Sequence, residues 1–361
     1  MISDDYEKIK YGICRYNNIG DITCYMNSIL HILQQVPVLA DFIYTCSYSD
    51  ILKYKSKGDD NYIKNCLIYE LFRLFYASMT HDDISITPTS FKHNIGQKND
   101  MWNEENHQDS QEFLSFLIST IEEEIGVKVE FIPKFNEIEE NINYINLLAN
   151  IAWQTFQKNE YSPLKEMFNG MFYIQTKCSC CSNISPNFEP FTTLQIAIPF
   201  SDPKKEFLLI DCLDELIKEE QLDDDNMYNC EMCGIKNKGY KQSLLWKTPK
   251  ILVIHIKRFS GSESKKIINK INYPLYNLDI SKFCHIKSPF IQKSKYNLIG
   301  VNLHQEFSYL GTNSGHYTSL VKNRLDNNWY LFNDGSEPIQ LTEKEHIQNR
   351  NAYLLFYYRQ D

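Results

Sequence analysis

The sequence has no long hydrophobic stretch. No apolar run approaches the roughly 18 residues that a membrane-spanning helix needs. The N-terminal segment MISDDYEKIK lacks the apolar core of a secretory signal peptide. We also find no internal repeat, no P-loop and no glycine-rich dinucleotide fingerprint. These absences predict a soluble protein without a membrane segment that resides inside the cell, in the cytoplasm or the nucleus.

Basic residues are fewer than acidic residues. Lys and Arg total 37 against 46 Asp and Glu, which gives a formal net charge of −9. Because nucleic-acid binding depends largely on a basic face, this balance argues against a nucleic-acid partner and suits a basic one. With 361 residues, 43% of them hydrophobic and 23% charged, the chain has the composition of a globular protein with a sizeable core.

One cysteine stands at the start of a predicted helix. Apolar residues recur with helical spacing after Cys24, which predicts an amphipathic helix that begins at or just after Cys24 and ends before Pro37. The amide N–H groups and the dipole at a helix start favour a thiolate, and a nearby imidazolium would favour it further. A cysteine is more often a small buried hydrophobe, so the interpretation of Cys24 as a nucleophile depends on these surroundings.

A histidine opens a predicted strand near the end of the chain. His316 precedes the β-branched and apolar run Thr318 to Val321, and a second strand-like run, Trp329 to Phe332, follows a short polar loop. The second run ends in a turn signal that begins with Asn333 and Asp334. The two runs predict a hairpin that brings Asn333 or Asp334 beside His316, and the sequence does not rank these two candidates.

Two cysteine pairs with metal-ligand spacing occur between these segments. The pairs are Cys178 with Cys181 and Cys230 with Cys233. Four thiolates fit tetrahedral zinc, and a closed Cys₄ site is structural because it leaves no position for substrate. The separation of the pairs predicts that the metal ties the tips of two hairpins together, with Cys180 as a spare thiol. A disulfide pair or a chance arrangement is the alternative.

Two acidic residues share one face of another predicted helix. Asp109 and Glu112 are three residues apart, beside apolar residues of a helix predicted over 110–124. They could hold a cationic ligand, or they could form a solvated helix face or a helix cap. A further helix is predicted over 61–78, and the segment 304–314, rich in Gly, Ser and Asn near its end, predicts a mobile loop.

Taken together, five segments resemble the catalytic domain of the ubiquitin-specific proteases, a family of papain-like cysteine peptidases. The residues that carry the resemblance lie in segments 23–28, 107–114, 255–259, 315–334 and 352–357. The similarity runs from about residue 11 to residue 358, which leaves almost no room for a second domain.

The resemblance implies an α+β fold with a helical thumb, a β-rich palm and zinc-tipped β fingers. We therefore expect a single catalytic domain over 1–361. Its thumb would cover about 11–125, a variable polar insertion about 129–152, the fingers about 166–250 and the palm about 251–361. It further implies one structural Zn²⁺ held by the four cysteines, and no catalytic cofactor.

The resemblance also implies roles for the candidate residues. Cys24 would be the nucleophile, His316 the general base and Asn333 the residue that orients the imidazole, with Asp334 as a second candidate for that task. Asn18 would donate a hydrogen bond to the oxyanion. Its position departs from the family pattern by one extra residue between Gly20 and Cys24, so the role requires this residue to bulge outward.

The implied activity is hydrolysis of the bond after the C-terminal glycine of ubiquitin. Ubiquitin and ubiquitinated proteins would be the partners, Asp109 and Glu112 would help to hold the ubiquitin tail, and the protein would act as a monomer. A channel that admits only Gly-Gly would exclude larger side chains. Two alternatives stay open: a catalytically inactive ubiquitin-binding module, and a papain-like protease for another ubiquitin-like modifier.

Overall fold

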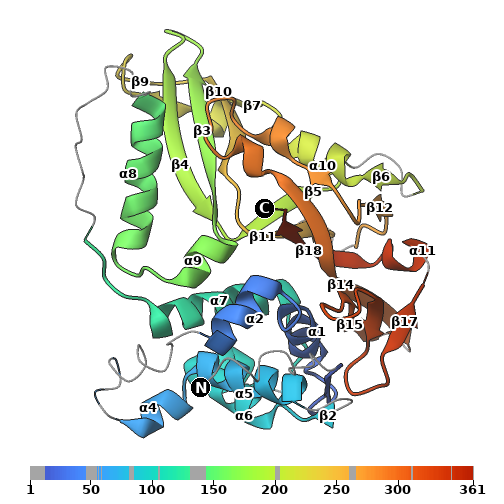
Figure 1. The fold of residues 1–361 in the computed structure, drawn as a ribbon. Helices are drawn as coiled ribbons and strands as arrows, with labels where there is room; N and C mark the ends of the chain where they lie inside the picture. The colour runs from blue at the N-terminus through green and yellow to red at the C-terminus, as the bar shows by residue number, and fades with distance from the viewer. Residues whose placement is uncertain are drawn as a thin grey trace. The chain divides into compact units, whose positions relative to one another are not determined.

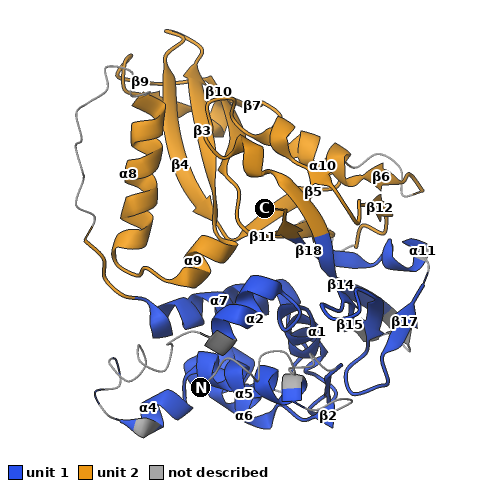
Figure 2. Ribbon diagram, in the orientation of Figure 1, with its two compact units in different colours: residues 1–126, 298–357 blue, residues 127–297, 358–361 orange. Residues whose placement is uncertain are grey.

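The computed structural model describes residues 13–45, 55, 57, 59–80, 85–104, 106–130, 144–199, 204–259, 266–309, 312–342 and 344–360. The chain forms two compact units (Figures 1 and 2). Unit 1 contains residues 1–126 and 298–357, and unit 2 contains residues 127–297 and 358–361. The chain leaves unit 1 and returns to it, so the N-terminal helices and the C-terminal strands belong to the same unit.

Unit 1 combines helices with an antiparallel sheet. Its helical elements are α1 (Cys24–Leu33), α2 (Pro37–Thr45), α4 (Asp60–Lys64), α5 (Leu67–Thr80), α6 (Thr89–Lys98), η2 (Asp100–Trp102), α7 (Ser110–Ile125) and α11 (Lys344–Ile347). Its strands are β1 (Arg15–Tyr16), β2 (Ser85–Ile86), β14 (Lys295–Tyr309), β15 (Thr312–Lys322), β16 (Trp329–Phe332), β17 (Ile339–Leu341) and β18 (Ala352–Arg359), although residues 295–297 of β14 and 358–359 of β18 belong to unit 2. The larger sheet has the order β17-β16-β15-β14-β18 in this unit, and β1 pairs with β2.

Helix α1 is the central element of unit 1. It begins at Cys24 and ends at Leu33, as predicted, and it contacts both α7 and β15. All ten of its residues are buried, so the helix is surrounded by protein and does not have the solvent-facing side that its amphipathic pattern predicted. A helix start inside the protein removes Cys24 from water, which affects its chemistry.

The helix predicted over 61–78 is divided in two. Helix α4 ends at Lys64 and α5 begins at Leu67. The carboxylate of Glu124, on α7, accepts hydrogen bonds from the backbone N–H groups of Leu67 (2.8 Å) and Ile68 (3.0 Å). These amides lie in the first turn of α5, where no carbonyl of the same helix can pair with them. The first turn of α5 is therefore capped by a side chain from α7. Local residue spacing could not predict this start of the helix.

The C-terminal strands confirm the predicted hairpin. β15 and β16 pair antiparallel, with Ser319 opposite Phe332 and Lys322 opposite Trp329. The prediction of a loop is wrong for residues 304–309 and 312–314, however. β14 and β15 pair up to Tyr309 opposite Thr312, and residues 310–311 lie outside the described residues.

Unit 2 consists mainly of short strands. Its strands are β3 (Gly170–Cys178), β4 (Ile184–Phe191), β5 (Thr193–Ala197), β6 (Phe207–Leu208), β7 (Glu220–Leu222), β8 (Tyr228–Cys230), β9 (Ile235–Asn237), β10 (Gly239–Lys247), β11 (Ile251–Lys257), β12 (Ile271–Asn272) and β13 (Leu278–Asp279). Its helical elements are α8 (Tyr144–Lys158), α9 (Pro163–Phe168), α10 (Leu209–Leu216), η3 (Asp224–Asn226), η4 (Ser281–Phe283) and η5 (Ile291–Lys293). The four-stranded sheet has the order β4-β3-β10-β7, β8 pairs with β9, and β11 pairs with β5 in parallel.

Helix α8 occupies part of the stretch predicted as a polar insertion. Residues 131–143 of that stretch lie outside the described residues, whereas residues 144–158 form α8. The helix runs beside β4 (Figure 1) and contacts it. Ala149 and the aromatic residues Tyr173, Phe188 and Trp246 belong to one buried cluster, against which Trp153 packs. The C-terminal part of the predicted insertion is therefore built into the core of unit 2.

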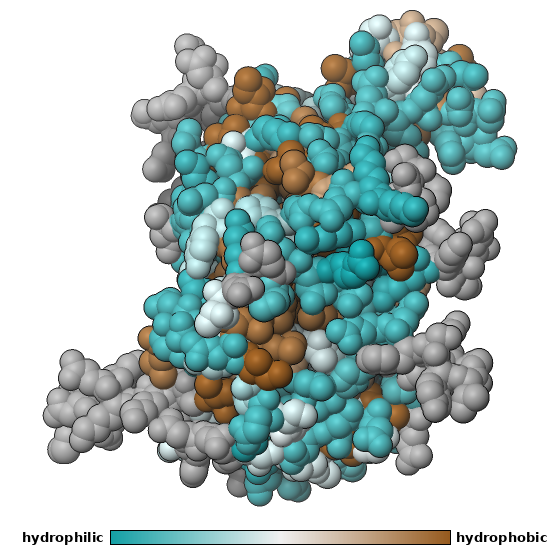
Figure 3. Space-filling model, turned by 90° about the vertical axis from the view of Figure 1, so that its right-hand side faces the viewer, coloured by the Kyte–Doolittle hydropathy of each residue, from teal (hydrophilic) through white to brown (hydrophobic). Residues whose placement is uncertain are grey.

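The surface is mainly hydrophilic on the face drawn in Figure 3, where hydrophobic residues form scattered groups. Single exposed apolar residues are normal on soluble proteins, and Ile286 and Met232 are examples here. Among the described residues, no helix has both the length and the apolar character needed to cross a membrane.

A buried histidine lies in the core of unit 1. His31, on α1, is 1% exposed and stacks between Tyr16 (ring centroids 4.9 Å apart) and Phe332 (4.5 Å). Neither ring nitrogen has a hydrogen-bond partner among the described residues. Burial lowers the pKa of His31 to about 3, because a charged imidazole in this position would lose its hydration.

This histidine should make the folded state sensitive to acid. The unfolded chain binds a proton on His31 below about pH 6.5, whereas the folded protein does so only near its lowered pKa of about 3. Stability is therefore lost as the pH falls below 6.5, by at most about 1.4 kcal/mol per pH unit. The variant His31→Phe keeps an aromatic ring and removes the titration. Its free energy of unfolding in urea should fall less between about pH 7.5 and about pH 5.5 than that of the wild type. Parallel pH dependences would contradict this prediction.

Candidate active site and metal centre

The sulfur of Cys24 is buried at the start of a helix. Cys24 is the first residue of α1 and is 1% exposed. The backbone N–H groups of Tyr317, of Tyr25 and of Cys24 itself lower the pKa of its thiol. Because Tyr317 directly follows His316 on β15, the sulfur lies against the strand that carries the histidine.

The resting thiol is protonated at neutral pH. Burial raises the pKa of Cys24 to about 11, and the charge of Asp334 raises it as well, whereas the three N–H groups act in the opposite direction. The thiolate that we predicted from the helix start is therefore wrong for this conformation. The N–H groups lower the pKa of the thiol as expected, but the loss of hydration raises it by more. A base is needed to remove the thiol proton.

The extra residue before Cys24 bulges into solvent. Gly20 (φ 61°) and Asp21 (φ 58°) are both exposed and lie in the left-handed region. They occupy the centre of a turn in which the N–H of Ile22 donates to the carbonyl of Ile19 (3.3 Å). Positive φ at both central positions is the signature of a type I′ turn. The structure thus meets the geometric condition for Asn18, although its role as an oxyanion donor stays a prediction.

Asn18 joins the start of α1 to the turn after β16. Its side-chain oxygen accepts hydrogen bonds from the backbone N–H (2.7 Å) and the hydroxyl (2.9 Å) of Thr23. Its side-chain nitrogen donates to Asp334 Oδ2 (3.0 Å). Since one partner is an amide donor and the other a carboxylate, the orientation of the Asn18 amide is fixed.

His316 lies closest to Asn333. Its Nε2 is 2.7 Å from Asn333 Oδ1 and 3.9 Å from Asp334 Oδ2. An acceptor at one ring nitrogen places the proton there and leaves the other nitrogen able to accept a proton. Of the two candidates left open by the sequence, the geometry thus favours Asn333 as the residue that orients the imidazole.

Asp334 is a partly buried carboxylate held by two amides. It is 13% exposed and has a positive φ of 47°. Asn27 Nδ2 donates to its Oδ1 (2.8 Å), and Asn18 donates to its Oδ2. Burial raises the pKa of Asp334, whereas Asn27, His316 and Asn18 act in the opposite direction. The carboxylate therefore links the segment before α1, α1 itself and the turn after β16.

Asp109 is an N-cap in this structure. Its Oδ1 accepts hydrogen bonds from the N–H groups of Gln111 (2.7 Å) and Glu112 (3.1 Å) at the start of α7. Its Oδ2 accepts from the hydroxyls of Tyr353 (2.6 Å) and Tyr317 (3.4 Å). The capping alternative therefore describes Asp109 here. Glu112 is exposed, and contact of either residue with a substrate stays a prediction.

Sequence reasoning missed some residues that shape this site. Asn27 lies three positions after Cys24, one helical turn away, and its Nδ2 also donates to the carbonyl of Tyr16 (3.1 Å). Gly335 follows Asp334, and a Cβ there would lie 2.1 Å from Asn17 Oδ1. The i,i+3 spacing could have drawn attention to Asn27. The close approach at Gly335 leaves no signal beyond the turn motif itself.

The four predicted zinc ligands come together at two hairpin turns of unit 2. Cys178 ends β3, Cys181 lies in the turn before β4, Cys230 ends β8, and Cys233 lies in the turn before β9. The ligand atoms of these four cysteines all lie within 4.8 Å of one another. This arrangement agrees with the prediction that a metal would tie two hairpin tips together.

The sulfur geometry fits zinc. The sulfurs of Cys178 and Cys233 are 3.8 Å apart, and those of Cys181 and Cys230 are 3.7 Å apart. A tetrahedral site with Zn–S bonds of about 2.3 Å separates its sulfurs by about 3.8 Å. The N–H of Cys180 points at the sulfur of Cys178 (3.4 Å), which would stabilise a thiolate. Cys180 is not one of the four clustered residues, in agreement with its prediction as a spare thiol.

A buried thiol at the start of a helix, packed against the strand whose histidine is oriented by an amide, is typical of cysteine-type hydrolases. A family model narrows the class, because the model described as ubiquitin carboxyl-terminal hydrolase matches residues 14–357. The chain belongs to this family and forms a ubiquitin-specific protease catalytic domain.

Individual relatives agree with this assignment. The chain is 31% identical over 350 residues to ubiquitin carboxyl-terminal hydrolase Usp2 of Drosophila melanogaster, covering 96% of this chain and 35% of that protein. It is 31% identical over 360 residues to ubiquitin carboxyl-terminal hydrolase 2 of Gallus gallus, covering 97% and 94%. It therefore spans only part of several relatives, such as 55% of the Bos taurus protein.

A solved structure shares the fold. A chain in the structure of the SAGA Ubp8/Sgf11/Sus1/Sgf73 DUB module bound to ubiquitin aldehyde superimposes with a TM-score of 0.71 at 24% identity. The match covers 98% of this chain and 70% of that one. The similarity supports the α+β architecture of a ubiquitin-specific protease.

The charge of Asp334 should slow the reaction of Cys24 with alkylating agents. Since this charge raises the pKa of Cys24, Asp334→Asn should increase the rate of iodoacetamide alkylation at about pH 7.5. The wild-type rate should rise about tenfold per pH unit up to a pKa of about 11. Mass spectrometry of the Cys24 peptide measures both effects. Asp21→Asn, which removes an exposed carboxylate, is the matched control, and equal rates in the two variants would contradict the prediction.

The metal centre should depend on Cys230 but not on Cys180. Cys230→Ser should reduce zinc from about one ion per chain to a small fraction, because it replaces a thiolate ligand. Cys180→Ser should retain the metal, since Cys180 lies outside the cluster of four sulfurs. Elemental analysis of protein purified without chelator checks both results. A wild type without zinc, or equal loss in both variants, would overturn the assignment of the ligands.

Proposed function

We propose that this protein is a deubiquitinase that hydrolyses the isopeptide or peptide bond after the C-terminal glycine of ubiquitin through an acyl-enzyme on Cys24. Membership of the ubiquitin carboxyl-terminal hydrolase family supports the substrate class. One structural observation carries the chemistry. His316 has an amide oxygen at Nε2, and the strand that carries it packs against α1, the helix that Cys24 begins.

The proposed reaction begins with proton transfer from the thiol to His316. The thiolate attacks the carbonyl carbon of the terminal glycine, and the protonated imidazole then donates its proton to the leaving amine. Water, deprotonated by His316, releases the acyl group from the sulfur. Asn333 holds the imidazole in the required tautomer, as an amide carbonyl can do in Cys-His-Asn proteases. Since burial raises the pKa of Cys24 to about 11, the thiolate forms during the reaction and not before it.

Asn18 is the proposed side-chain donor to the oxyanion. Its nitrogen carries two N–H groups and donates one hydrogen bond to Asp334. The second N–H is available to the tetrahedral intermediate, while the contacts to Thr23 and Asp334 hold the amide in place. Asp334 acts in this proposal as a positioning residue, because it orients Asn18 and lies near His316. A preorganised donor of this kind typically contributes about 3 to 4 kcal/mol to transition-state stabilisation.

The proposed substrate is the extended tail of ubiquitin. In the SAGA module structure noted above, the matched protein assembly is bound to ubiquitin aldehyde. Glu112 is exposed and could contact a cationic tail directly. Asp109 has its carboxylate occupied by two backbone N–H groups and two tyrosine hydroxyls, so it contributes by ordering the start of α7 and the Tyr317 side chain. One structural Zn²⁺, a monomeric state and a cytoplasmic or nuclear location complete the proposal.

A ubiquitin probe with a C-terminal electrophile tests this function. The wild type should form a covalent adduct of increased mass on a denaturing gel, and Cys24→Ala should form none, because the adduct requires the Cys24 sulfur. Cys180→Ala, which removes an exposed thiol, is the matched control and should label like the wild type. Binding of the probe without an adduct would favour the inactive-module alternative. Reaction solely with a probe made from another ubiquitin-like modifier would overturn the choice of substrate.

A further inference from the structure

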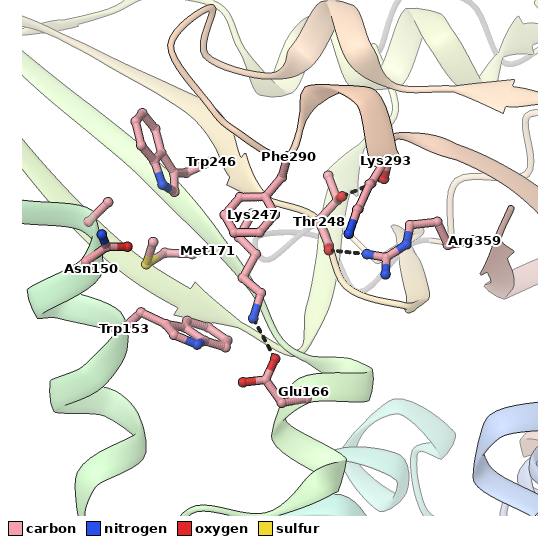
Figure 4. A pocket seen from close by; sticks show the side chains of 11 residues that line it. Asn150, Trp153, Glu166, Met171, Trp246, Lys247, Thr248, Phe290, Lys293 and Arg359 are labelled. Carbon is pink, nitrogen blue, oxygen red and sulfur yellow. Dashed lines mark hydrogen bonds and ion pairs between the residues drawn. The ribbon is translucent and has the colours of Figure 1, made fainter. Parts of the chain in front are cut away.

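A cavity of about 270 Å³ lies in unit 2, away from the residues assigned to the thiol chemistry or to the metal. Its walls come from α8, α9, β3, β10, η5 and the end of β18, all within unit 2. Figure 4 shows the side chains that line it. The volume approaches the range in which proteins hold small ligands, which starts at about 300 Å³. The cavity is therefore large enough for a ring with a small polar group.

Aromatic side chains form its apolar walls. Trp153 projects from α8, Phe290 immediately precedes η5, and both line the cavity (Figure 4). Trp246 is 2% exposed and packs against Phe188 and Tyr173, so it forms a rigid floor. Flat apolar walls of this kind favour a ring over a flexible chain.

One cation in the cavity is already paired. Lys247 Nζ lies 2.8 Å from Glu166 Oε2, and it lies over the rings of Trp153 (3.5 Å to the centroid) and Phe290 (5.9 Å). The other oxygen of Glu166 accepts a hydrogen bond from Gln157. Glu166 is the sole carboxylate among the lining residues, and both of its oxygens already have a partner, Lys247 or Gln157.

Two further cations line the same cavity without such a partner. Arg359 and Lys293 form no ion pair with a described carboxylate, and Lys293 is exposed. Arg359 Nη1 donates to the carbonyl of Thr248 (3.1 Å), while its buried Nε has no hydrogen-bond partner among the described residues. Burial lowers the pKa of Lys247 and Arg359 lowers it too, so these two cations repel each other, whereas Glu166 acts in the opposite direction. The cavity therefore carries excess positive charge in a chain of net charge −9.

We propose that this cavity binds an aryl phosphate, with its ring against the aromatic lining and its phosphate at Arg359 and Lys293. A phosphate monoester carries a charge of about −1.5 to −2 at neutral pH, which matches the two cations that lack a carboxylate partner. The planar guanidinium of Arg359 suits phosphate oxygens, and a carboxylate would balance only one of the cations. The proposal is independent of the proposed function, because none of these residues belongs to the thiol site.

Two sources share this chemistry: a free aryl phosphate, and the phosphotyrosine side chain of a partner protein. Phenyl phosphate represents the first source, and a phosphotyrosyl tetrapeptide represents the second. Comparable affinity for the two probes would assign the site to a modified protein. Binding of phenyl phosphate alone would assign it to a small molecule.

Isothermal titration calorimetry on the full chain provides the test. Phenyl phosphate should bind with a stoichiometry of about one. Inorganic phosphate, which lacks the ring, and phenol, which lacks the phosphate, should each bind at least about tenfold more weakly. Absence of phenyl phosphate binding at about 10 mM, or equal affinity for inorganic phosphate, would overturn the proposal.

Matched variants locate the binding. Arg359→Gln and Lys293→Gln should each weaken phenyl phosphate binding by about tenfold or more. Lys293 is exposed, so its replacement tests the proposal without disturbing the core. Lys218→Gln, which removes an exposed lysine of unit 2 outside the cavity, should leave the affinity unchanged. An unchanged affinity in Lys293→Gln, or equal weakening in Lys218→Gln, would show that the ligand binds elsewhere.

Discussion

Asp334 holds its carboxylate where little water reaches it, and the arrangement of the thiol site depends on the contacts of this group. A poorly hydrated carboxylate is costly unless donors surround it. Here the donors are the side-chain amides of Asn18 and Asn27. Asn18 comes from the segment before Cys24, and Asn27 comes from the helix that begins at Cys24. The carboxylate thereby fixes the turn that carries Asn333 relative to Cys24, although it touches neither the substrate nor the sulfur in the proposed reaction.

The elements that the sequence predicted well are those that depend on neighbouring residues. The start of α1 at Cys24 and its end before Pro37 follow from local spacing, and the β15–β16 hairpin follows from two apolar runs and a turn. The metal ligands follow from spacing within each pair, because two short turns can present four sulfurs once the hairpins form. In each case the structure needs little information from distant parts of the chain.

The predictions that failed depend on distant contacts. The carboxylate of Glu124 caps the start of α5 from another helix. Residues 304–309 and 312–314 form paired strands instead of a loop. The pKa of Cys24 was expected to be low from the helix start alone, but its value depends on how deeply other elements bury α1. The substrate contact of Asp109 stays a prediction, but local spacing did not indicate its hydrogen bonds with Tyr317 and Tyr353, which lie more than two hundred residues further along the chain.

The turn at Gly20 and Asp21 shows how an active site can tolerate a change in chain length next to its nucleophile. The additional residue is accommodated in solvent, and the hydrogen bonds between Asn18 and Thr23 span the turn at its base. A change of chain length at this turn can therefore be taken up without displacing the sulfur of Cys24. For the same reason, the exposed position 21 would accept a fluorescent amino acid as a reporter only three residues from Cys24.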